Sequence, residues 1–353
     1  MQQNMAQVVV ESNDNLAVHN TEIPKVVKGS VLVKVKYSGL CGSDIPRIFH
    51  EGAHFYPITL GHEFSGEVVE VGEGVSSIEV GNNISCAPLV PCFKCDRCEE
   101  GQYSLCKDYS FVGSRMPGGN AEYVIVPERS CFVLPEGISL KQGAFFEPVT
   151  VGIHPILMAG GCAGKNVVVI GVGTIGLLAL QSAKALGAKT VTAVDINESK
   201  LDKAKELGAD FCINSLKQNS IDAFLAQKET LENQLILETA GSPITVKLAT
   251  QLAGPRASIG LVGTLHKDLH MTYKEFEVIL RKELNLFGSW MNYSAPYPGE
   301  EWKVTAELFQ KDLINIDMLT EGSFGPQDYI SHVSKLEGMP SEGKILLAWG
   351  EES

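Results

Sequence analysis

The first 150 residues alternate polar and apolar positions in short runs that are separated by glycine- and proline-containing turns. β-Branched residues dominate these runs, which predicts strands rather than helices. This part of the chain is therefore expected to be mainly β. The expected strands are 8–10, 31–37, 68–71 and 121–126.

The pattern changes near residue 150, where continuous apolar runs begin to alternate with helix-like stretches. A fully apolar run suits a strand that is buried on both faces, as in a parallel sheet covered by helices. The alternation ends near 286–288, and one clear helix and a final strand follow. The expected strands are 166–170, 190–194, 211–213, 235–238, 257–262 and 344–349, and the expected helices are 174–186, 198–207 and 300–313.

Composition supports packed domains and excludes several classes of protein. The chain has 353 residues, 44% of them hydrophobic, which is enough for about two domains with packed cores. No apolar stretch has the length of a membrane span and the N-terminus lacks a signal-peptide pattern, so a soluble cytoplasmic protein is expected. The formal net charge of −13 argues against nucleic-acid binding, because such a surface repels phosphate backbones.

A glycine-rich turn between the strand 166–170 and the helix 174–186 predicts a dinucleotide site. In this GxGxxG motif the first glycine permits a tight turn, the second lets the backbone approach a pyrophosphate, and the third lets helix and strand pack closely. Asp195, at the end of the next strand, can accept a bond from a ribose hydroxyl and repels a 2′-phosphate, so NAD is expected rather than NADP. The expected cofactor-binding residues are Gly171, Gly173, Thr174, Ile175, Gly176 and Asp195.

Four of the nine cysteines lie within 15 residues and form the strongest single signal in the chain. Four thiolates so close together can surround one Zn²⁺ tetrahedrally, and the metal would fix a polar loop that has little core of its own. Because protein ligands would fill all four positions, the site is expected to be structural. An iron–sulfur cluster is the competing interpretation. The expected ligands are Cys92, Cys95, Cys98 and Cys106.

Three further candidates for metal binding have ordinary structural explanations when each is taken alone: Cys41 as a buried thiol, His62 as a turn histidine and Glu147 as a helix cap. Their order along the chain, together with the four cysteines and the dinucleotide motif, resembles the zinc-dependent medium-chain alcohol and polyol dehydrogenases over nearly the whole sequence. The resemblance implies that Cys41 and His62 bind a catalytic zinc, and that Glu63, Glu147 or a water completes its shell.

The chemistry that the resemblance implies is hydride transfer from an alcohol to a nicotinamide ring, with zinc as the Lewis acid. Ser43 is expected to take the hydroxyl proton, and Asp44 to orient the zinc-binding histidine or its loop. Many family members carry a histidine three residues after this serine, where this chain has Pro46. His50, Glu147 or ordered water would then complete the path of the proton.

Three runs, 38–49, 52–66 and 288–296, narrow the resemblance to members of the family that act on a sugar-alcohol phosphate. The implied reaction is oxidation of galactitol 1-phosphate to tagatose 6-phosphate with NAD. A dehydrogenase of free polyols such as sorbitol or xylitol, and a non-catalytic zinc-binding interaction protein, are the alternatives. An arginine fork suits phosphate geometry, and the candidates are Arg115, then Arg47, then Arg281 unless it is only a helix-end charge.

The resemblance also implies an α/β fold with two domains. A GroES-like, β-barrel-type catalytic domain is expected over 1–153 and 292–353, and a Rossmann domain with a doubly wound parallel sheet over 154–291. A homodimer is expected as well, because relatives pair edge strands near the end of the Rossmann sheet, here around 287–291.

Overall fold

The computed structural model describes residues 3–50, 52–337 and 341–350, and the chain forms two compact units. Of the described residues, the first unit contains those up to Glu147, Tyr293–Gln310 and those from Ile316 onward. The second unit contains Pro148–Asn292 and Lys311–Asn315. Within the described part of the chain, no helix has both the length and the apolar character needed to cross a bilayer.

The first unit is built on a seven-stranded, mostly antiparallel sheet, as its alternating sequence predicts. Its order is β16-β17-β3-β4-β5-β9, and β8 also pairs with β3. β4 pairs with the long strand β3 along one edge. On the other edge of β3, β8 pairs with its first half and β17 with its end. Two-stranded pairs β1–β2 and β6–β7 complete the unit. The strands are β1 Asn4–Ser12, β2 Asn15–Glu22, β3 Ser30–Gly39, β4 Glu63–Val71, β5 Asn83–Cys86, β6 Leu89–Val90, β7 Ser110–Phe111, β8 Tyr123–Pro127, β9 Cys131–Val133, β16 Thr320–Phe324 and β17 Lys344–Ala348.

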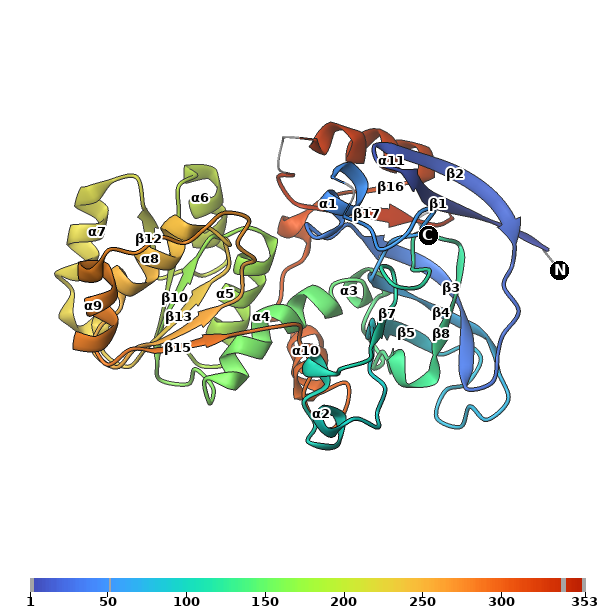
Figure 1. Ribbon diagram of the computed structural model, residues 1–353, viewed down its shortest axis with the longest axis horizontal. Helices are drawn as coiled ribbons and strands as arrows, with labels where there is room; N and C mark the ends of the chain where they lie inside the picture. The colour runs from blue at the N-terminus through green and yellow to red at the C-terminus, as the bar shows by residue number, and fades with distance from the viewer. Residues whose placement is uncertain (1–2, 51, 338–340, 351–353) are drawn as a thin grey trace. The chain divides into compact units, whose positions relative to one another are not determined.

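The helices of the first unit are mostly short. Helix α11, which the sequence pattern did not predict, packs against β16, β17 and β2 at one end of the sheet (Figure 1). Its Tyr329 and Val333 enter an apolar core to which the strands β1, β3, β4, β5, β8 and β17 all contribute. The helices are α1 Asp44–Phe49, α2 Asp96–Glu99, α3 Leu140–Gly143, α10 Glu300–Gln310 and α11 Pro326–Val333.

The second unit contains a six-stranded parallel sheet with helices on both faces, which confirms the predicted Rossmann architecture (Figure 1). The strands lie in the order β12-β11-β10-β13-β14-β15. The chain therefore adds strands on one side of β10 and then on the other, and parallel sheets bind ligands at this switch point between β10 and β13. Every residue of β10 is buried, as its continuous apolar run predicts. The strands are β10 Asn166–Ile170, β11 Thr190–Asp195, β12 Phe211–Asn214, β13 Gln234–Glu238, β14 Ser258–Leu261 and β15 Asn285–Gly288, and the helices are α4 Phe146–Met158, α5 Thr174–Ala185, α6 Glu198–Glu206, α7 Gln218–Leu225, α8 Pro243–Leu252 and α9 Tyr273–Arg281.

The division between the units differs from the expected boundaries of 153/154 and 291/292. Most of helix α4 belongs to the second unit, because Gly152 packs so closely that a Cβ there would lie 2.9 Å from the backbone of Ala179 in α5. The segment Lys311–Asn315 also belongs to this unit, and the backbone N–H of Asn315 donates to the side chain of Gln181 at 2.7 Å.

Candidate metal centres and cofactor site

The structure brings the four clustered cysteines together around one point. Their Sγ atoms all lie within 4.8 Å of one another, and the Cys92–Cys98 and Cys95–Cys106 pairs are each 4.0 Å apart. Tetrahedral zinc–thiolate bonds of about 2.3 Å place sulfur atoms about 3.8 Å apart, so the spacing fits one ion. The group is too compact to enclose a cluster of several irons.

One thiol of this group, Cys95, has a lowered pKa, which favours cation binding. Hydrogen bonds from the backbone N–H groups of Lys107 and Cys98 lower the pKa of Cys95 to about 6, which favours the thiolate form that binds zinc. Burial raises the pKa of Cys98 to about 12, and a bound cation would reverse that preference. Aromatic contacts anchor the lobe, with Phe93 edge-on to Tyr297 at 5.3 Å between ring centroids.

The second group of candidate ligands lies where β3 ends and β4 begins. Ligand atoms of Cys41, His62 and Glu63 all lie within 4.8 Å of one another. Within the described part of the chain, His62 Nδ1 and Glu63 Oε1 are buried without a hydrogen-bond partner. Burial and then the charge of Glu63 raise the pKa of the Cys41 thiol. A thiol, an imidazole and a carboxylate with unsatisfied buried atoms fit a divalent cation such as zinc.

Ser43 lies on the turn that follows Cys41, and Asp44 begins helix α1. The hydroxyl of Ser43 donates to Cys41 Sγ at 3.3 Å and accepts from Arg47 Nη1 at 2.9 Å. The buried carboxylate of Asp44 accepts from Arg47 at 3.0 Å and lies 3.6 Å from His62 Nδ1, beyond hydrogen-bond distance. Asp44 therefore stabilises the turn through its hydrogen bond with Arg47, whereas its interaction with His62 is electrostatic only.

A buried lysine that the sequence analysis missed holds the carboxylate of this group. Lys344 Nζ lies 2.6 Å from Glu63 Oε2 and donates to the carbonyl of Leu40 at 3.1 Å. Both charged side chains are at most 5% exposed. The sequence contained one signal of this ion pair, a lysine at the start of the apolar run 344–349. A charge in a buried strand has to be paired, so this lysine required an acidic partner.

Glu147 lies outside the group of Cys41, His62 and Glu63. It occupies the first turn of α4 and is buried, and its charge contributes to the raised pKa of Cys41. Pro46 lies within α1, and its carbonyl accepts hydrogen bonds from the backbone N–H groups of His50 and Gly52. The imidazole of His50 has no hydrogen bond to the Ser43 hydroxyl among the described contacts.

The glycine-rich turn has the geometry that its motif predicts. Gly171 has a φ of +89°, and a Cβ there would lie 2.6 Å from Ala240. A Cβ on Gly176 would lie 2.0 Å from the carbonyl oxygen of Gly171, whereas one on Gly173 would meet nothing within 4 Å. Gly173 therefore leaves open space in front of the first turn of α5, where Thr174 and Ile175 present backbone N–H groups to an anion.

Asp195 lies at the end of β11, and its carboxylate fixes the turns around it. Oδ2 accepts from the backbone N–H of Val172 at 2.9 Å, and Oδ1 accepts from Ile196 and Asn197 at 2.8 and 3.0 Å. A carboxylate has about four acceptor sites, so capacity for a ribose hydroxyl remains. The sequence did not predict that Asp195 also holds the glycine-rich turn.

The turn after β13 supports the glycine-rich turn, and the sequence analysis missed it. The hydroxyl of Thr239 donates to the carbonyl of Gly171 at 2.6 Å. The fully buried Glu238 accepts from the backbone N–H groups of Ala240 and Gly241, both at 3.0 Å, and burial raises its pKa. The sequence signal for this support was Glu238, a charged residue that ends the apolar run 235–237.

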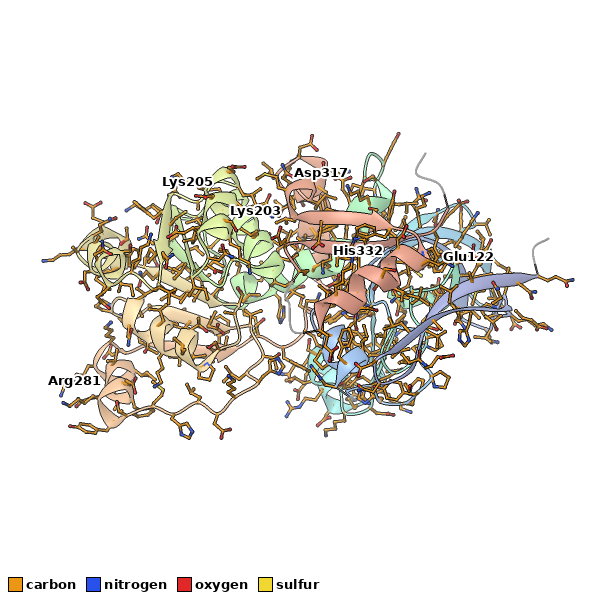
Figure 2. The ribbon with its side chains drawn as sticks, turned by 90° about the horizontal axis from the view of Figure 1, so that it is seen from above. Glu122, Lys203, Lys205, Arg281, Asp317 and His332 are labelled. Carbon is orange, nitrogen blue, oxygen red and sulfur yellow. The ribbon has the colours of Figure 1, made fainter. Side chains whose placement is uncertain are left out.

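The arginines predicted to bind phosphate lie in different units. Arg47 and Arg115 belong to the first unit, and the guanidinium of Arg115 lies 4.5 Å above the ring of Tyr109. Arg281 belongs to the second unit, where it ends helix α9 and pairs with Glu277 at 2.8 Å on the outer surface (Figure 2). Arg281 is therefore a helix-end charge.

The fold and the two groups of candidate metal ligands are those of a zinc-type dehydrogenase, and the chain belongs to that family. Residues 27–136 match the alcohol dehydrogenase GroES-like domain, and residues 174–311 match the zinc-binding dehydrogenase domain. The protein is therefore an oxidoreductase, as the resemblance implied.

The chain is similar over nearly its whole length to several proteins of known sequence or structure. It is 48% identical over 346 residues to galactitol 1-phosphate 5-dehydrogenase of Escherichia coli K12, covering 97% of this chain and 99% of the relative. The crystal structure of the Escherichia coli galactitol-1-phosphate dehydrogenase superposes with a TM-score of 0.95 at 47% identity, covering 98% and 100% of the two chains. A zinc-binding dehydrogenase of Sinorhizobium meliloti 1021 bound to NADP matches with a TM-score of 0.89 at 31% identity, covering 99% and 100%.

Proposed function

We propose that this enzyme oxidises galactitol 1-phosphate to tagatose 6-phosphate with NAD. The observation that carries the proposal is the 48% identity, over 97% of the chain, to the enzyme named for the first of these compounds. In this reaction a secondary alcohol loses a hydride from carbon to the nicotinamide ring and a proton from oxygen, and becomes a ketone.

The proposed catalytic site is the turn of Cys41 together with His62 and Glu63. Cys41 and His62 hold zinc, with Glu63, Glu147 or a water as a further ligand. A zinc ion bound there supplies Lewis acidity, which lowers the pKa of the substrate hydroxyl. Ser43 Oγ, beside Cys41 Sγ, takes the hydroxyl proton.

The proton must continue from Ser43 by a path that does not use position 46, because Pro46 cannot carry it. His50, Glu147 or ordered water completes this path. Asp44 and Arg47 keep the turn rigid, so that the Ser43 hydroxyl stays beside the reacting oxygen.

The proposed cofactor is NAD, bound at the glycine-rich turn by Gly171, Gly173, Thr174, Ile175 and Gly176. Asp195 supports the choice of NAD over NADP, because its carboxylate repels a 2′-phosphate. Both cofactors occur among the relatives: one structure is bound to NADP, and another, from Escherichia coli CFT073, is complexed with NADH. The Cys92, Cys95, Cys98 and Cys106 group holds a second, structural zinc.

The test is an NAD reduction assay over galactitol 1-phosphate, galactitol, sorbitol and xylitol. A phosphate held by two charge-assisted bonds should raise kcat/KM for galactitol 1-phosphate by roughly a hundredfold or more over galactitol. A preference for xylitol or sorbitol would instead support a free-polyol dehydrogenase, an alternative kept because the chain is also 33% identical to D-xylulose reductase A of Aspergillus niger.

A homodimer is part of the proposal. β15 ends the six-stranded sheet, and helix α9 before it exposes Tyr273, Phe276 and Leu280, at 76%, 53% and 63%, on positions three or four residues apart. A second copy of the chain would cover this stripe and extend the sheet from β15. Light scattering should give twice the chain mass, and Phe276→Glu with Leu280→Glu should give the monomer.

The proposed location is the cytoplasm. All nine cysteines are free thiols in the structure, which suits a reducing compartment that keeps zinc-binding thiolates available.

A further inference from the structure

Glu238, the last residue of β13, connects the end of this strand to the start of helix α8. Its Oε1 accepts hydrogen bonds from the backbone N–H groups of Ala240 and Gly241, both at 3.0 Å, and from the hydroxyl of Thr245 at 2.8 Å. Thr245 lies in the first turn of α8. One carboxylate oxygen therefore fixes the strand end, the turn after it and the beginning of the helix relative to one another.

The same residue also holds the turn after β14. The backbone carbonyl of Glu238 accepts from the N–H groups of Val262 and Gly263, at 2.9 and 3.0 Å. A Cβ on Gly263 would overlap the backbone nitrogen of Gly241, and one on Gly241 would overlap the carbonyl oxygen of Thr264. The turns after β13 and β14 are therefore packed backbone against backbone, with Glu238 bonded to both.

These two turns lie on the side of the switch point away from Asp195. Strands β11 and β12 are on one side of β10, whereas β13 and β14 are on the other. A dinucleotide crosses such a sheet at the switch point, with its pyrophosphate at the glycine-rich turn and one mononucleotide half over each side. Because Asp195 ends β11 and is assigned to the adenosine ribose, the nicotinamide half belongs over the turns after β13 and β14.

The carboxyl group of Glu238 is costly to keep at this position. The side chain is fully buried, and within the described part of the chain its Oε2 has no hydrogen-bond partner. Burial raises the pKa of Glu238, which shows that the surroundings disfavour its charged form. An apolar residue would avoid this cost but could not accept from the two turn N–H groups. The residue is therefore suited to fixing the turns rather than to packing the strand.

We propose that Glu238 is a positioning residue for the nicotinamide half of the cofactor, which it serves by fixing the turns after β13 and β14 in the arrangement that receives this half. The inference rests on the proposed cofactor site. The glycine-rich turn and Asp195 hold the pyrophosphate and the adenosine half, and these contacts do not use the bonds to Glu238 Oε1. The two halves of the cofactor therefore depend on different residues of one sheet edge.

Isothermal titration calorimetry with NADH and with AMP tests this division, because AMP carries only the adenosine half. Glu238→Ala should raise the Kd for NADH by about tenfold, and the Kd for AMP should stay nearly unchanged. Glu238→Gln retains an acceptor oxygen at the same distance along the side chain, so it should recover most of the affinity for NADH. Equal weakening of NADH and AMP binding in Glu238→Ala would overturn the proposal, since it would show support of the fold alone.

Gln234→Ala is the matched control, at the opposite end of the same strand. Gln234 is 3% exposed, accepts from the backbone N–H of Gly254 at 2.6 Å and, like Glu238, has one buried side-chain atom without a partner. This variant should lower the melting temperature and leave the ratio of the two Kd values at that of the wild type. A ratio that changes as much as in Glu238→Ala would also contradict the proposal.

Thr245→Val keeps the inference testable if Glu238→Ala does not fold. It removes one of the three bonds to Oε1 and should raise the Kd for NADH relative to that for AMP by a smaller factor. An unchanged ratio in Thr245→Val, together with one in Glu238→Gln, would overturn the proposal when Glu238→Ala cannot be measured.

The binding measurements are separate from the proposed reaction. If the enzyme does not oxidise galactitol 1-phosphate, the proposed substrate is wrong, and a changed ratio in Glu238→Ala still supports the positioning role. If the wild type binds NADPH and not NADH, the proposed choice of NAD is wrong. The same variants measured with NADPH and adenosine 2′-monophosphate then decide the inference by the same ratio.

Discussion

Lys344 Nζ lies 2.6 Å from Glu63 Oε2, and this buried ion pair connects the last strand of the chain to the candidate catalytic metal site. Burial alone would lower the pKa of Lys344, but the charges of Glu63 and Cys41 prevail and raise it, so the ammonium remains protonated. Lys344 also donates to the carbonyl of Leu40, the residue before Cys41. The pair therefore holds both the carboxylate of Glu63 and the turn that carries the Cys41 thiol.

Removing one partner of this pair should be costly. Lys344→Met leaves Glu63 buried without its cation, which should lower the free energy of unfolding by about 3 to 5 kcal/mol in urea denaturation. Adding Glu63→Gln should recover part of that loss, because the uncompensated charge is gone. Lys28→Met, which removes a pair that is 75% and 79% exposed, should cost at most about 1 kcal/mol. Equal losses for Lys344→Met and Lys28→Met would contradict the role given to Lys344.

The four-cysteine lobe should depend on its metal. Metal analysis of the wild-type protein should find close to two zinc ions per chain, and Cys98→Ser should retain one. The variant should also have a lower melting temperature, because metal binding contributes to folding in a lobe with little apolar core. Cys212→Ser, a change at an exposed cysteine, is the control and should alter neither quantity. Full zinc content in Cys98→Ser would refute the structural site.

The Cys41 group should bind the other zinc. Cys41→Ser should lose that ion and the dehydrogenase activity, while far-UV circular dichroism stays that of the wild type, because the core around β3 does not need the metal. If the wild type contains one zinc and Cys41→Ser keeps it, the catalytic zinc has been misassigned.

Asp195 should govern the choice of dinucleotide. The wild type should prefer NAD over NADP by orders of magnitude in kcat/KM, and Asp195→Ala should weaken use of NAD and relax this preference. Because the carboxylate also holds the N–H of Val172, binding of both cofactors should weaken somewhat in the variant. A wild-type enzyme that uses NADP equally well would show that Asp195 does not face the ribose.

The elements that the sequence predicted correctly are those with local causes. Strand β10 is apolar from Val167 to Ile170, and in the turn after it Gly171 takes a positive φ and Gly176 packs against the carbonyl of Gly171. One of the helices that was missed, α4, carries conflicting local signals. Helix α4 contains Pro155 and Gly152, which disfavour an isolated helix, and it forms because Gly152 lets α4 pack closely on α5.

The sequence by itself determined the groups whose members lie close together along the chain. Cys92 to Cys106 and the glycine-rich turn are short enough for spacing alone to predict their chemistry. Only the tertiary structure decided which distant charges meet. Glu63 and Lys344 are 281 positions apart, and they come together because β17 pairs with β3 at the register that ends beside Leu40. Such pairings depend on burial and sheet register, which no local pattern encodes.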